Sequence, residues 1–461
     1  MEEATSVKVV EVCQVTPPEG ASTPTSLPFT FFDMIWLRLP PVERLFFYEF
    51  TNLNTSLFFD TIVPKLKHYL SLTLKHFLPL AGTITWPNDS PHPIINYVPG
   101  NVVSLTIAES NIDFNMLCSN TCEASLRLHL VPHLASSNDH TSVMALQVTL
   151  FPNHGFSLGI SIHHAATDGK ATTMFLKAWA YACSNITTES SSLPEHLTPF
   201  FDRSMIKDTS GIGADYAKAW LNFGGPNNKS VKVMQMDRGT ANVVGTANVV
   251  STDETIRGSF ELTSSNIQKL KQYAKSKLKE DAHVSTYAVT CAYVLQCLVK
   301  AEQSKANGVA FFFSVDCRSR LEPPIPSTYF GNCIIGRKVM DETKKLLGND
   351  AFINALEGFN GTLKRMEDGV LNEAMTLYTM MQIAKDNRII TTAGSPRFEV
   401  YSIDFGWGKP KKVDMTSIGK TGAFCVSESR NDKRGIEVSL VLNKREMETF
   451  TANFTAGLSS F

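Results

Sequence analysis

The chain has 461 residues, of which 43% are hydrophobic and 19% charged, and its formal net charge is −1. A chain of this length predicts two to three domains, and the composition is that of an ordinary globular protein. A net charge so close to zero gives no support for a polyanionic partner, so we expect no nucleic-acid binding. We find no long apolar run and expect no membrane span.

The first residues and the cysteines bear on the cellular compartment. The stretch MEEATSVKVVEVCQV begins with acidic residues and lacks the basic and apolar regions of a secretory signal. The nine cysteines are scattered along the chain and odd in number, which favours buried thiols in a reducing compartment over disulfides. We therefore expect a cytoplasmic protein.

Helical and strand patterns alternate in the first 190 residues. The range 58–79 predicts a helix, since apolar residues recur at helical spacing. Its predicted buried stripe consists of Phe59, Ile62, Val63, Leu66, Leu70 and Phe77. Residues 143–151 and 156–164 predict two strands joined by a Pro-Asn-His-Gly turn, and a further helix is predicted after Asp168. Residues 1–190 therefore predict a mixed α/β domain.

Residues 191–250 differ in composition and predict a long crossing loop. The stretch NITTESSSLPEHLTPF is rich in Ser, Thr and Pro, which favours irregular structure. Residues 239–250 contain GTANVV twice in tandem, a period too short for a solenoid, which indicates a small duplication in a tolerant surface connection.

Regular patterns resume in residues 251–461. Helices are predicted at 265–279, at 285–302 and after Asn443, and strands at 256–262, 309–316, 399–406 and 436–442. The whole chain therefore predicts two α/β domains, 1–190 and 251–461, connected by the crossing loop.

The stretch SIHHAATDGKAT, residues 161–172, places two histidines before an aspartate and a glycine. If the strand runs to residue 164, alternation places His164 on its apolar face and His163 on the opposite face, which argues against one shared metal. Burial disfavours the imidazolium, so His164 should stay neutral and able to accept a proton. Asp168 stands where strand gives way to helix, a position at which aspartate is a favoured N-cap.

Two motifs resemble those of the plant BAHD acyltransferase family. They are HHAATDG at 163–169 and DFGWGKP at 404–410; the first alone also occurs in bacterial acetyltransferases and peptide-synthetase condensation domains. The stretch YFGNC at 329–333 resembles the clade that acylates anthocyanin and flavonoid glycosides. The resemblance implies two similar mixed-sheet domains of the chloramphenicol acetyltransferase type, with the active site in a tunnel between them, in a monomer.

The resemblance also implies a reaction. Malonyl would pass from malonyl-CoA, a co-substrate, to a sugar hydroxyl, the glucose 6″-OH, of a flavonoid, isoflavonoid or anthocyanin glucoside, with no permanently bound cofactor. His164 is the implied general base, and Asp168 is assigned to positioning. Asp404, Gly406 and Gly408 form a motif implied to be structural, and Arg318 is the candidate ion-pair partner of Asp404.

The anionic groups of malonyl-CoA need partners. Lys271 and the Ser285–Thr286 pair, at a predicted helix start, are candidates for the phosphate end, because a helix N-terminus favours anions; a solvated helix face is an equal alternative for Lys271. The malonyl carboxylate requires a cation. Lys170 is the first candidate and Arg38 and Arg44 are the others, although each charge is more often found at the surface.

Three other functions stay open on the sequence alone. One is a hydroxycinnamoyl-CoA-dependent acyltransferase acting on the same glycosides, and another is a metal-dependent hydrolase built on His163, His164 and Asp168. The third is a non-catalytic binding protein for small molecules. Assays with both donors, a chelator and a measurement of CoA release distinguish these functions.

Overall fold

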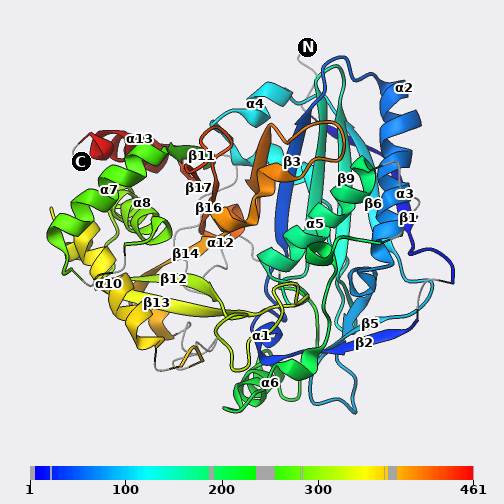
Figure 1. Ribbon diagram of the computed structural model, residues 1–461, viewed down its shortest axis with the longest axis horizontal. Helices are drawn as coiled ribbons and strands as arrows, with labels where there is room; N and C mark the ends of the chain where they lie inside the picture. The colour runs from blue at the N-terminus through cyan, green and yellow to red at the C-terminus, as the bar shows by residue number, and fades with distance from the viewer. Residues whose placement is uncertain are drawn as a thin grey trace.

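The computed structural model describes residues 6–20, 23–185, 192–234, 255–280, 282, 284–367, 369–371, 382–459 and 461. Figure 1 shows two α/β halves side by side, the N-terminal half mainly in blue to cyan and the C-terminal half mainly in green to red. Each half has a mixed sheet and a hydrophobic core of its own. The predicted fold class is therefore confirmed.

The N-terminal half contains a six-stranded sheet in the order β1-β6-β9-β10-β3-β15 and a four-stranded sheet in the order β2-β5-β4-β8. In the larger sheet β6 and β9 are parallel and the other neighbours are antiparallel. Strands β9 and β10 are buried on both faces, which explains why neither contains a charged residue. The strands are β1 Val7–Val15, β2 Thr25–Pro28, β3 Val42–Glu49, β4 Thr83–Thr85, β5 Ile94–Tyr97, β6 Val103–Ser110, β8 Thr141–Ser142, β9 Met144–Phe151, β10 Gly155–Ile162 and β15 Lys412–Met415.

Among the helices of this half, α3 packs against α5 and contacts β1, and α1 packs against α6. They are α1 Phe31–Met34, α2 Thr55–Leu57, α3 Val63–Leu74, α4 Phe114–Cys118, α5 Gly169–Ser184 and α6 Ile212–Asn222. A π-helical turn at Phe58–Ile62 connects α2 to α3, and 3-10 turns lie at Leu78–Ala81, Ala124–Leu130, Glu195–Leu197 and Arg203–Met205.

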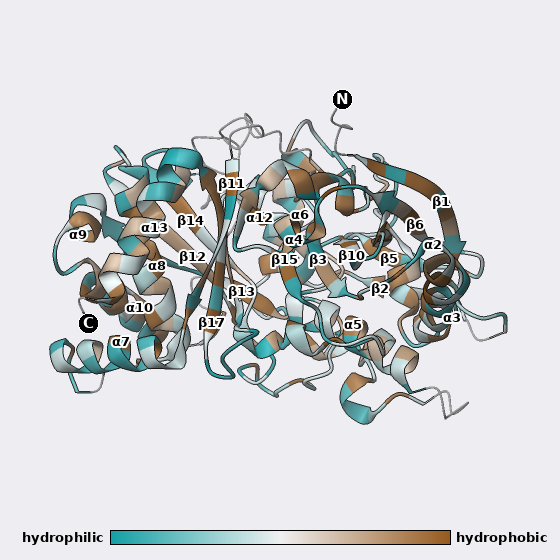
Figure 2. Ribbon diagram, turned by 90° about the horizontal axis from the view of Figure 1, so that it is seen from above, coloured by the Kyte–Doolittle hydropathy of each residue, from teal (hydrophilic) through white to brown (hydrophobic). Residues whose placement is uncertain are grey.

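The C-terminal half contains a seven-stranded sheet in the order β13-β12-β14-β16-β17-β11-β7. Helix α8 is buried along most of its length between α10 and α13, whereas α7, at the outer edge, is mainly hydrophilic (Figure 2). The strands are β7 Thr121–Glu123, β11 Thr255–Leu262, β12 Gly308–Asp316, β13 Ile334–Glu342, β14 Asn387–Ala393, β16 Phe424–Glu428 and β17 Ile436–Asn443. The helices are α7 Ser264–Lys277, α8 Thr286–Glu302, α9 Thr343–Leu347, α10 Ala351–Arg365, α12 Ile418–Thr421 and α13 Lys444–Leu458.

The two halves exchange edge strands. Strand β15, late in the chain, pairs with β3 of the N-terminal sheet, and β7, from the N-terminal region, pairs with β11 of the C-terminal sheet. Asp414 on β15 is buried and forms ion pairs with Arg127 at 2.5 Å and with Arg257 of β11. Each sheet thus contains a strand from beyond the predicted boundary of its half, and one buried carboxylate links the two.

Some predicted elements differ from those observed. The predicted strand at 399–406 is wrong: 3-10 turns lie at Pro396–Phe398 and Val400–Ser402, and a tight turn follows. Tyr401, Ile403 and Phe405 do alternate inward, but Glu399 and Gly406 have positive φ, so the backbone bends away from any strand partner. The predicted helix at 58–79 is divided among α2, the π turn and α3, and ends before Leu78-Pro79.

The predicted crossing loop is partly ordered. Residues 212–222 form α6, which packs against α1, while the GTANVV repeat lies outside the described residues. All nine cysteines lie in the described part of the chain and none forms a disulfide. Among the described residues, no helix has the length and apolar character needed to cross a membrane.

Candidate active site

The HHAATDG turn connects β10 to α5. Strand β10 ends at Ile162, and α5 begins at Gly169. Asp168 is the N-cap of α5, since its Oδ1 accepts a hydrogen bond from the N–H of Ala171 at 2.9 Å, so the predicted cap is confirmed. A Cβ at position 169 would lie 2.6 Å from the ring of Phe398, so glycine lets this ring pack on the start of the helix.

The two histidines of the turn have different surroundings. Because the strand ends before them, the predicted alternation does not extend to either residue, and the turn itself separates them. His163 is fully buried, and its Nδ1 accepts a hydrogen bond from the N–H of Ala165 at 3.1 Å. Burial lowers the pKa of His163 to about 3, so this residue is neutral at physiological pH.

His164 is partly exposed and stacks on Trp36, with ring centroids 3.7 Å apart and an interplanar angle of 6°. Burial lowers the pKa of His164 below its usual value, while its own backbone, Asp168, Asn332 and Asp33 oppose that shift. The ring is therefore neutral near pH 7. Its Nδ1 is buried without a hydrogen-bond partner among the described residues, which leaves Nε2 as the atom available to a ligand.

Arg318 does not pair with Asp404, and this prediction is wrong. Its Nη1 lies 2.8 Å from Oδ2 of Asp168 and 3.1 Å from Oδ1 of Asp316. The N–H of Cys333 also donates to Oδ2 of Asp168, at 3.1 Å. Both oxygens of Asp168 are thus engaged away from the imidazole, which excludes a triad in this arrangement and agrees with a positioning role for the aspartate.

Asp404 closes a glycine turn and forms no ion pair with any of the described residues. Its Oδ1 accepts hydrogen bonds from the N–H groups of Gly406 and Gly408, at 2.8 and 2.9 Å. Both glycines have positive φ, +97° and +96°, which other residues adopt only with strain. The intervening Trp407 packs its ring beneath Lys65, with Nζ 4.8 Å from the ring centroid. The DFGWG motif is therefore a turn anchored on the N-terminal half.

The three candidate cations for the acyl carboxylate differ in their burial and in their partners. Arg38 is buried and donates to the carbonyl oxygens of residues 223, 228 and 230, so its guanidinium is occupied. Arg44 is also buried, and its Nη1 donates a hydrogen bond to Thr173 Oγ1 at 3.4 Å. Lys170 is partly exposed and lies 3.5 Å from Asp316. The expectation of surface charges is therefore wrong for both arginines.

The candidates for the phosphate end of CoA do come together. Lys271 on α7 donates to Thr286 Oγ1 at 2.8 Å, and Ser285 is the N-cap of α8, accepting from the N–H of Ala288 at 3.1 Å. A cation thus stands at the start of a long helix.

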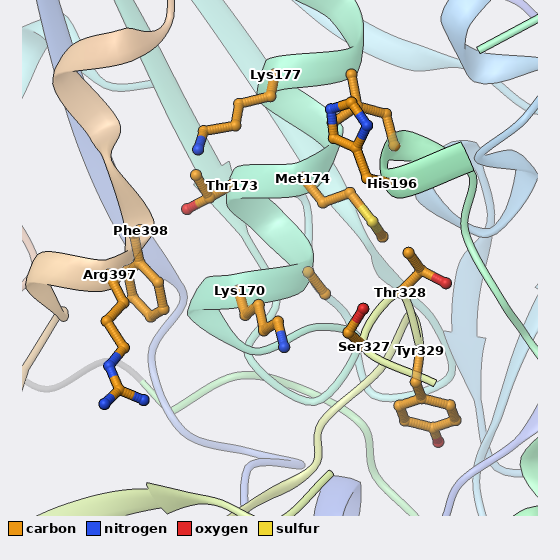
Figure 3. Close-up of a pocket in the computed structure, with 12 residues that line it drawn as sticks. Lys170, Thr173, Met174, Lys177, His196, Ser327, Thr328, Tyr329, Arg397 and Phe398 are labelled. Atoms are coloured by element: carbon orange, nitrogen blue, oxygen red, sulfur yellow. The ribbon is translucent and has the colours of Figure 1, made fainter. Parts of the chain in front are cut away.

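A cavity lies beside α5, with about 610 Å³ of open space including the part that faces solvent. Figure 3 shows Lys170, Thr173, Met174 and Lys177 of α5 between Arg397–Phe398 on one side and residues 327–329 on the other. Basic side chains and apolar side chains both line it, a combination that suits an amphipathic anion. Among the described residues, no group of three or more His, Cys, Asp or Glu side chains is placed to hold a metal.

Two residues at this site were not singled out by the sequence argument. Trp36 supplies the stacking surface for His164, and Asn332 donates from Nδ2 to the carbonyl oxygen of His164 at 2.8 Å. Asn332 belongs to the YFGNC stretch quoted for the family resemblance, so that motif was the available signal for it, whereas none of the three quoted motifs contains Trp36. Only the three-dimensional contact assigns them to this histidine.

Comparisons with known proteins assign this chain to a family. The Transferase family model matches residues 5–456. Phenolic glucoside malonyltransferase 1 of Arabidopsis thaliana is 36% identical over 471 residues, covering 99% of this chain and 98% of that protein. Malonyl-CoA:anthocyanidin 5-O-glucoside-6″-O-malonyltransferase of Arabidopsis thaliana is 37% identical over 465 residues, covering 98% of both. The crystal structure of vinorine synthase has the same fold, with a TM-score of 0.64 at 19% identity and 96% of each chain covered.

The fold, the HHAATDG turn and these likenesses define an acyl-CoA-dependent acyltransferase. The chain belongs to the Transferase family, and the resemblance to the plant BAHD acyltransferases is thereby confirmed.

Proposed function

We propose that this enzyme transfers malonyl from malonyl-CoA to the 6″-hydroxyl of the glucose of a flavonoid, isoflavonoid or anthocyanin glucoside. The observation that carries this proposal is the full-length similarity to malonyltransferases of phenolic and anthocyanin glucosides. The neutral, partly exposed His164 supports it, because a sugar hydroxyl needs a base when it attacks a thioester.

The proposed mechanism uses His164 as a general base and no covalent enzyme intermediate. Nε2 takes the proton of the acceptor hydroxyl as its oxygen attacks the thioester carbonyl. The resulting tetrahedral oxyanion re-forms the carbonyl and breaks the carbon–sulfur bond. The imidazolium then returns the proton to the departing CoA thiolate, which leaves CoA thiol, a malonyl ester and neutral His164.

Activity with several donors and acceptors tests the proposal. Purified enzyme is assayed with malonyl-, acetyl- and hydroxycinnamoyl-CoA against flavonoid, isoflavonoid and anthocyanin glucosides and against their free aglycones. We expect the highest kcat/KM with malonyl-CoA and a glucoside, and product in which the 6″-oxygen is esterified. A preference for hydroxycinnamoyl-CoA, or equal activity on aglycones, would contradict the assigned substrates.

Arg44 is the cation that we assign to the malonyl carboxylate. Its buried guanidinium lines a small cavity together with Ser395, Phe398 and Cys425, and within the described residues it forms no ion pair. Burial lowers the pKa of Arg44, and Cys425 and Glu428 oppose the shift. A ligand carboxylate would offset this desolvation directly. Lys170, in the larger cavity, already has Asp316 nearby and is the second candidate.

The choice of donor distinguishes these two cations. A charged hydrogen bond contributes roughly 1.5–3 kcal/mol, so Arg44→Gln should lower the ratio of kcat/KM for malonyl-CoA over acetyl-CoA by about ten- to a hundredfold. Lys207→Ala, which removes an exposed lysine, is the control with an unchanged ratio. If this ratio falls only in Lys170→Ala, Lys170 is the partner of the malonyl carboxylate. If the ratio is unchanged in both Arg44→Gln and Lys170→Ala, neither residue selects malonyl-CoA.

The phosphate end of CoA is proposed to meet Lys271 at the start of α8, with Ser285 and Thr286 beside it. The support is the anion-favouring helix N-terminus together with the adjacent ammonium. Lys271→Ala should raise the KM for malonyl-CoA and leave that for the glucoside unchanged. An unchanged donor KM would place this lysine among the solvated charges of α7.

A further inference from the structure

Asn332 is a fully buried amide that connects the C-terminal half to the base-bearing turn of the N-terminal half. It lies just before β13, yet its side chain bonds outside that sheet. Nδ2 donates to the carbonyl oxygen of His164 at 2.8 Å and to Oδ1 of Asp33 at 3.0 Å. The backbone N–H of Asn332 donates to the same Asp33 oxygen at 3.2 Å.

Asp33 is itself firmly held. It is fully buried in α1, and its Oδ2 accepts hydrogen bonds from the N–H and the hydroxyl of Thr30, both at 2.8 Å. The same oxygen forms an ion pair with buried Arg203 at 2.5 Å. A carboxylate that three other donors already hold gives Asn332 a charge-assisted anchor. The chain of contacts therefore runs from Arg203 through Asp33 and Asn332 to His164.

The segment 329–333 holds the other end of the turn as well. The N–H of Cys333 donates to Asp168, while Nη2 of Arg318 donates to the carbonyl oxygens of Tyr329 and Gly331 at 3.0 and 3.2 Å. Arg318 also pairs with Asp168 at 2.8 Å. Residues 164 and 168 are thus both fixed by one short segment from the opposite half.

The imidazole of His164 has no carboxylate to orient it. In a triad an aspartate holds the base through Nδ1. Here Nδ1 has no hydrogen-bond partner among the described residues, and Asp168 is turned toward Arg318 and Cys333. Trp36 fixes the plane of the ring by stacking, but a stack leaves the ring free to slide within that plane. The position of Nε2 therefore depends on where the backbone of His164 is held.

We propose that Asn332 is a positioning residue for acyl transfer, which holds the carbonyl of His164 and thereby places Nε2 at the acceptor hydroxyl. The inference rests on the proposed role of His164 as the base. In this proposal Asn332 of the YFGNC segment positions the base and contacts neither substrate. A misplacement of about 1 Å in a reacting group can lower a rate by around a hundredfold.

The test compares three variants of the full-length enzyme. Asn332→Ala removes the donors, and we expect kcat per folded molecule to fall about ten- to a hundredfold, while the KM of each substrate changes less than about threefold. Asn332→Asp keeps the shape but replaces the donors by a carboxylate, and should lose kcat similarly. Phe359→Leu is the control: this residue of α10 is buried against Phe311 and Phe313 in the core of the C-terminal half, and its variant should lower Tm without lowering kcat per folded molecule.

The pH profile separates positioning from a loss of folding. The Asn332 side chain raises the pKa of His164, so Asn332→Ala should move the acid limb of kcat/KM to lower pH. A carboxylate beside the base should move the limb of Asn332→Asp to higher pH. Circular dichroism and Tm give the folded fraction, and Asn332→Asp, which lacks the amide donors, carries the test if the alanine variant does not fold.

Two results would overturn the inference. One is kcat per folded molecule within about twofold of wild type in Asn332→Ala or Asn332→Asp; the other is a loss confined to KM with an unmoved acid limb. His164→Ala is measured alongside. If that variant is inactive while the Asn332 variants are normal, only the positioning role fails, whereas an active His164→Ala rejects the proposed base itself.

Discussion

His164 and His163 stand next to one another in the chain, but only His164 has a ring open to a ligand. We expect His164→Ala to lower kcat at least about a hundredfold with the fold retained, as for the loss of a general base. His163→Ala should leave more activity per folded molecule and lower Tm more, since it opens a cavity in the core. Steady-state kinetics corrected for the folded fraction provide the measurement. Equal losses of kcat in folded His164→Ala and folded His163→Ala would contradict the assignment of the general base to His164 alone.

The same residue sets the pH dependence. Because burial lowers the pKa of His164, the base becomes protonated only below the usual range of histidine. The acid limb of kcat/KM should therefore lie below about pH 6.5, with activity falling as the pH falls.

Asp168 combines a cap with a buried ion pair. Asp168→Asn keeps an oxygen for the Ala171 N–H but removes the charge that faces Arg318. Arg318 retains Asp316 at 3.1 Å, so we expect a loss of about 1–3 kcal/mol in the free energy of unfolding, with kcat reduced less than in His164→Ala. Urea denaturation and kcat of the folded variant measure the two effects. A folded Asn variant as inactive as His164→Ala would assign the carboxylate charge a direct part in the chemistry.

At the scale of elements, the DFGWG turn stabilises the enzyme through hydrogen bonds rather than through an ion pair. Asp404→Ala removes the acceptor of two backbone N–H groups at a partly exposed position. We expect a loss of about 1–2 kcal/mol in unfolding free energy and a nearly unchanged kcat per folded molecule. Asp404→Asn retains an acceptor oxygen and is the matched control. Loss of kcat in a fully folded Asp404→Ala would show that the turn acts on the reaction.

At the scale of the whole molecule, Asp414 joins the two halves through Arg127 and Arg257. Burial alone would raise the pKa of Asp414. Arg257, Arg127 and Lys412 together outweigh this effect, so the pKa of Asp414 is lowered overall. Asp414→Asn leaves two buried guanidinium groups without their carboxylate, and we expect a cost of about 3–5 kcal/mol in unfolding free energy. Chemical denaturation followed by tryptophan fluorescence measures it. A cost below about 1 kcal/mol would mean that the exchanged strands hold the halves together without this charge.

The sequence predicts most helices and core strands because their periodicity is local. The strand β9, the helix after Asp168 and the helix after Asn443 all follow from patterns within about fifteen residues. The partner of Arg318 did not follow, because Asp168 and Asp404 are both far from it in the chain and pairing depends on how the halves dock. The contacts of Asn332 and Trp36 with His164 could not be predicted for the same reason. A sequence motif does not specify which backbone carbonyl an amide will bond or which ring an indole will stack on.

The exchange of strands has a consequence for synthesis on the ribosome. When residue 162 has emerged, β3 still lacks the neighbour that β15 will supply about 250 residues later. At about 5–20 residues per second this interval lasts roughly 10–50 s, during which the edge formed by Arg44, Leu45, Phe46 and Phe47 is open to other nascent chains. We therefore expect this edge to attract chaperones during translation, and a chain truncated before Lys412 to be recovered as aggregate.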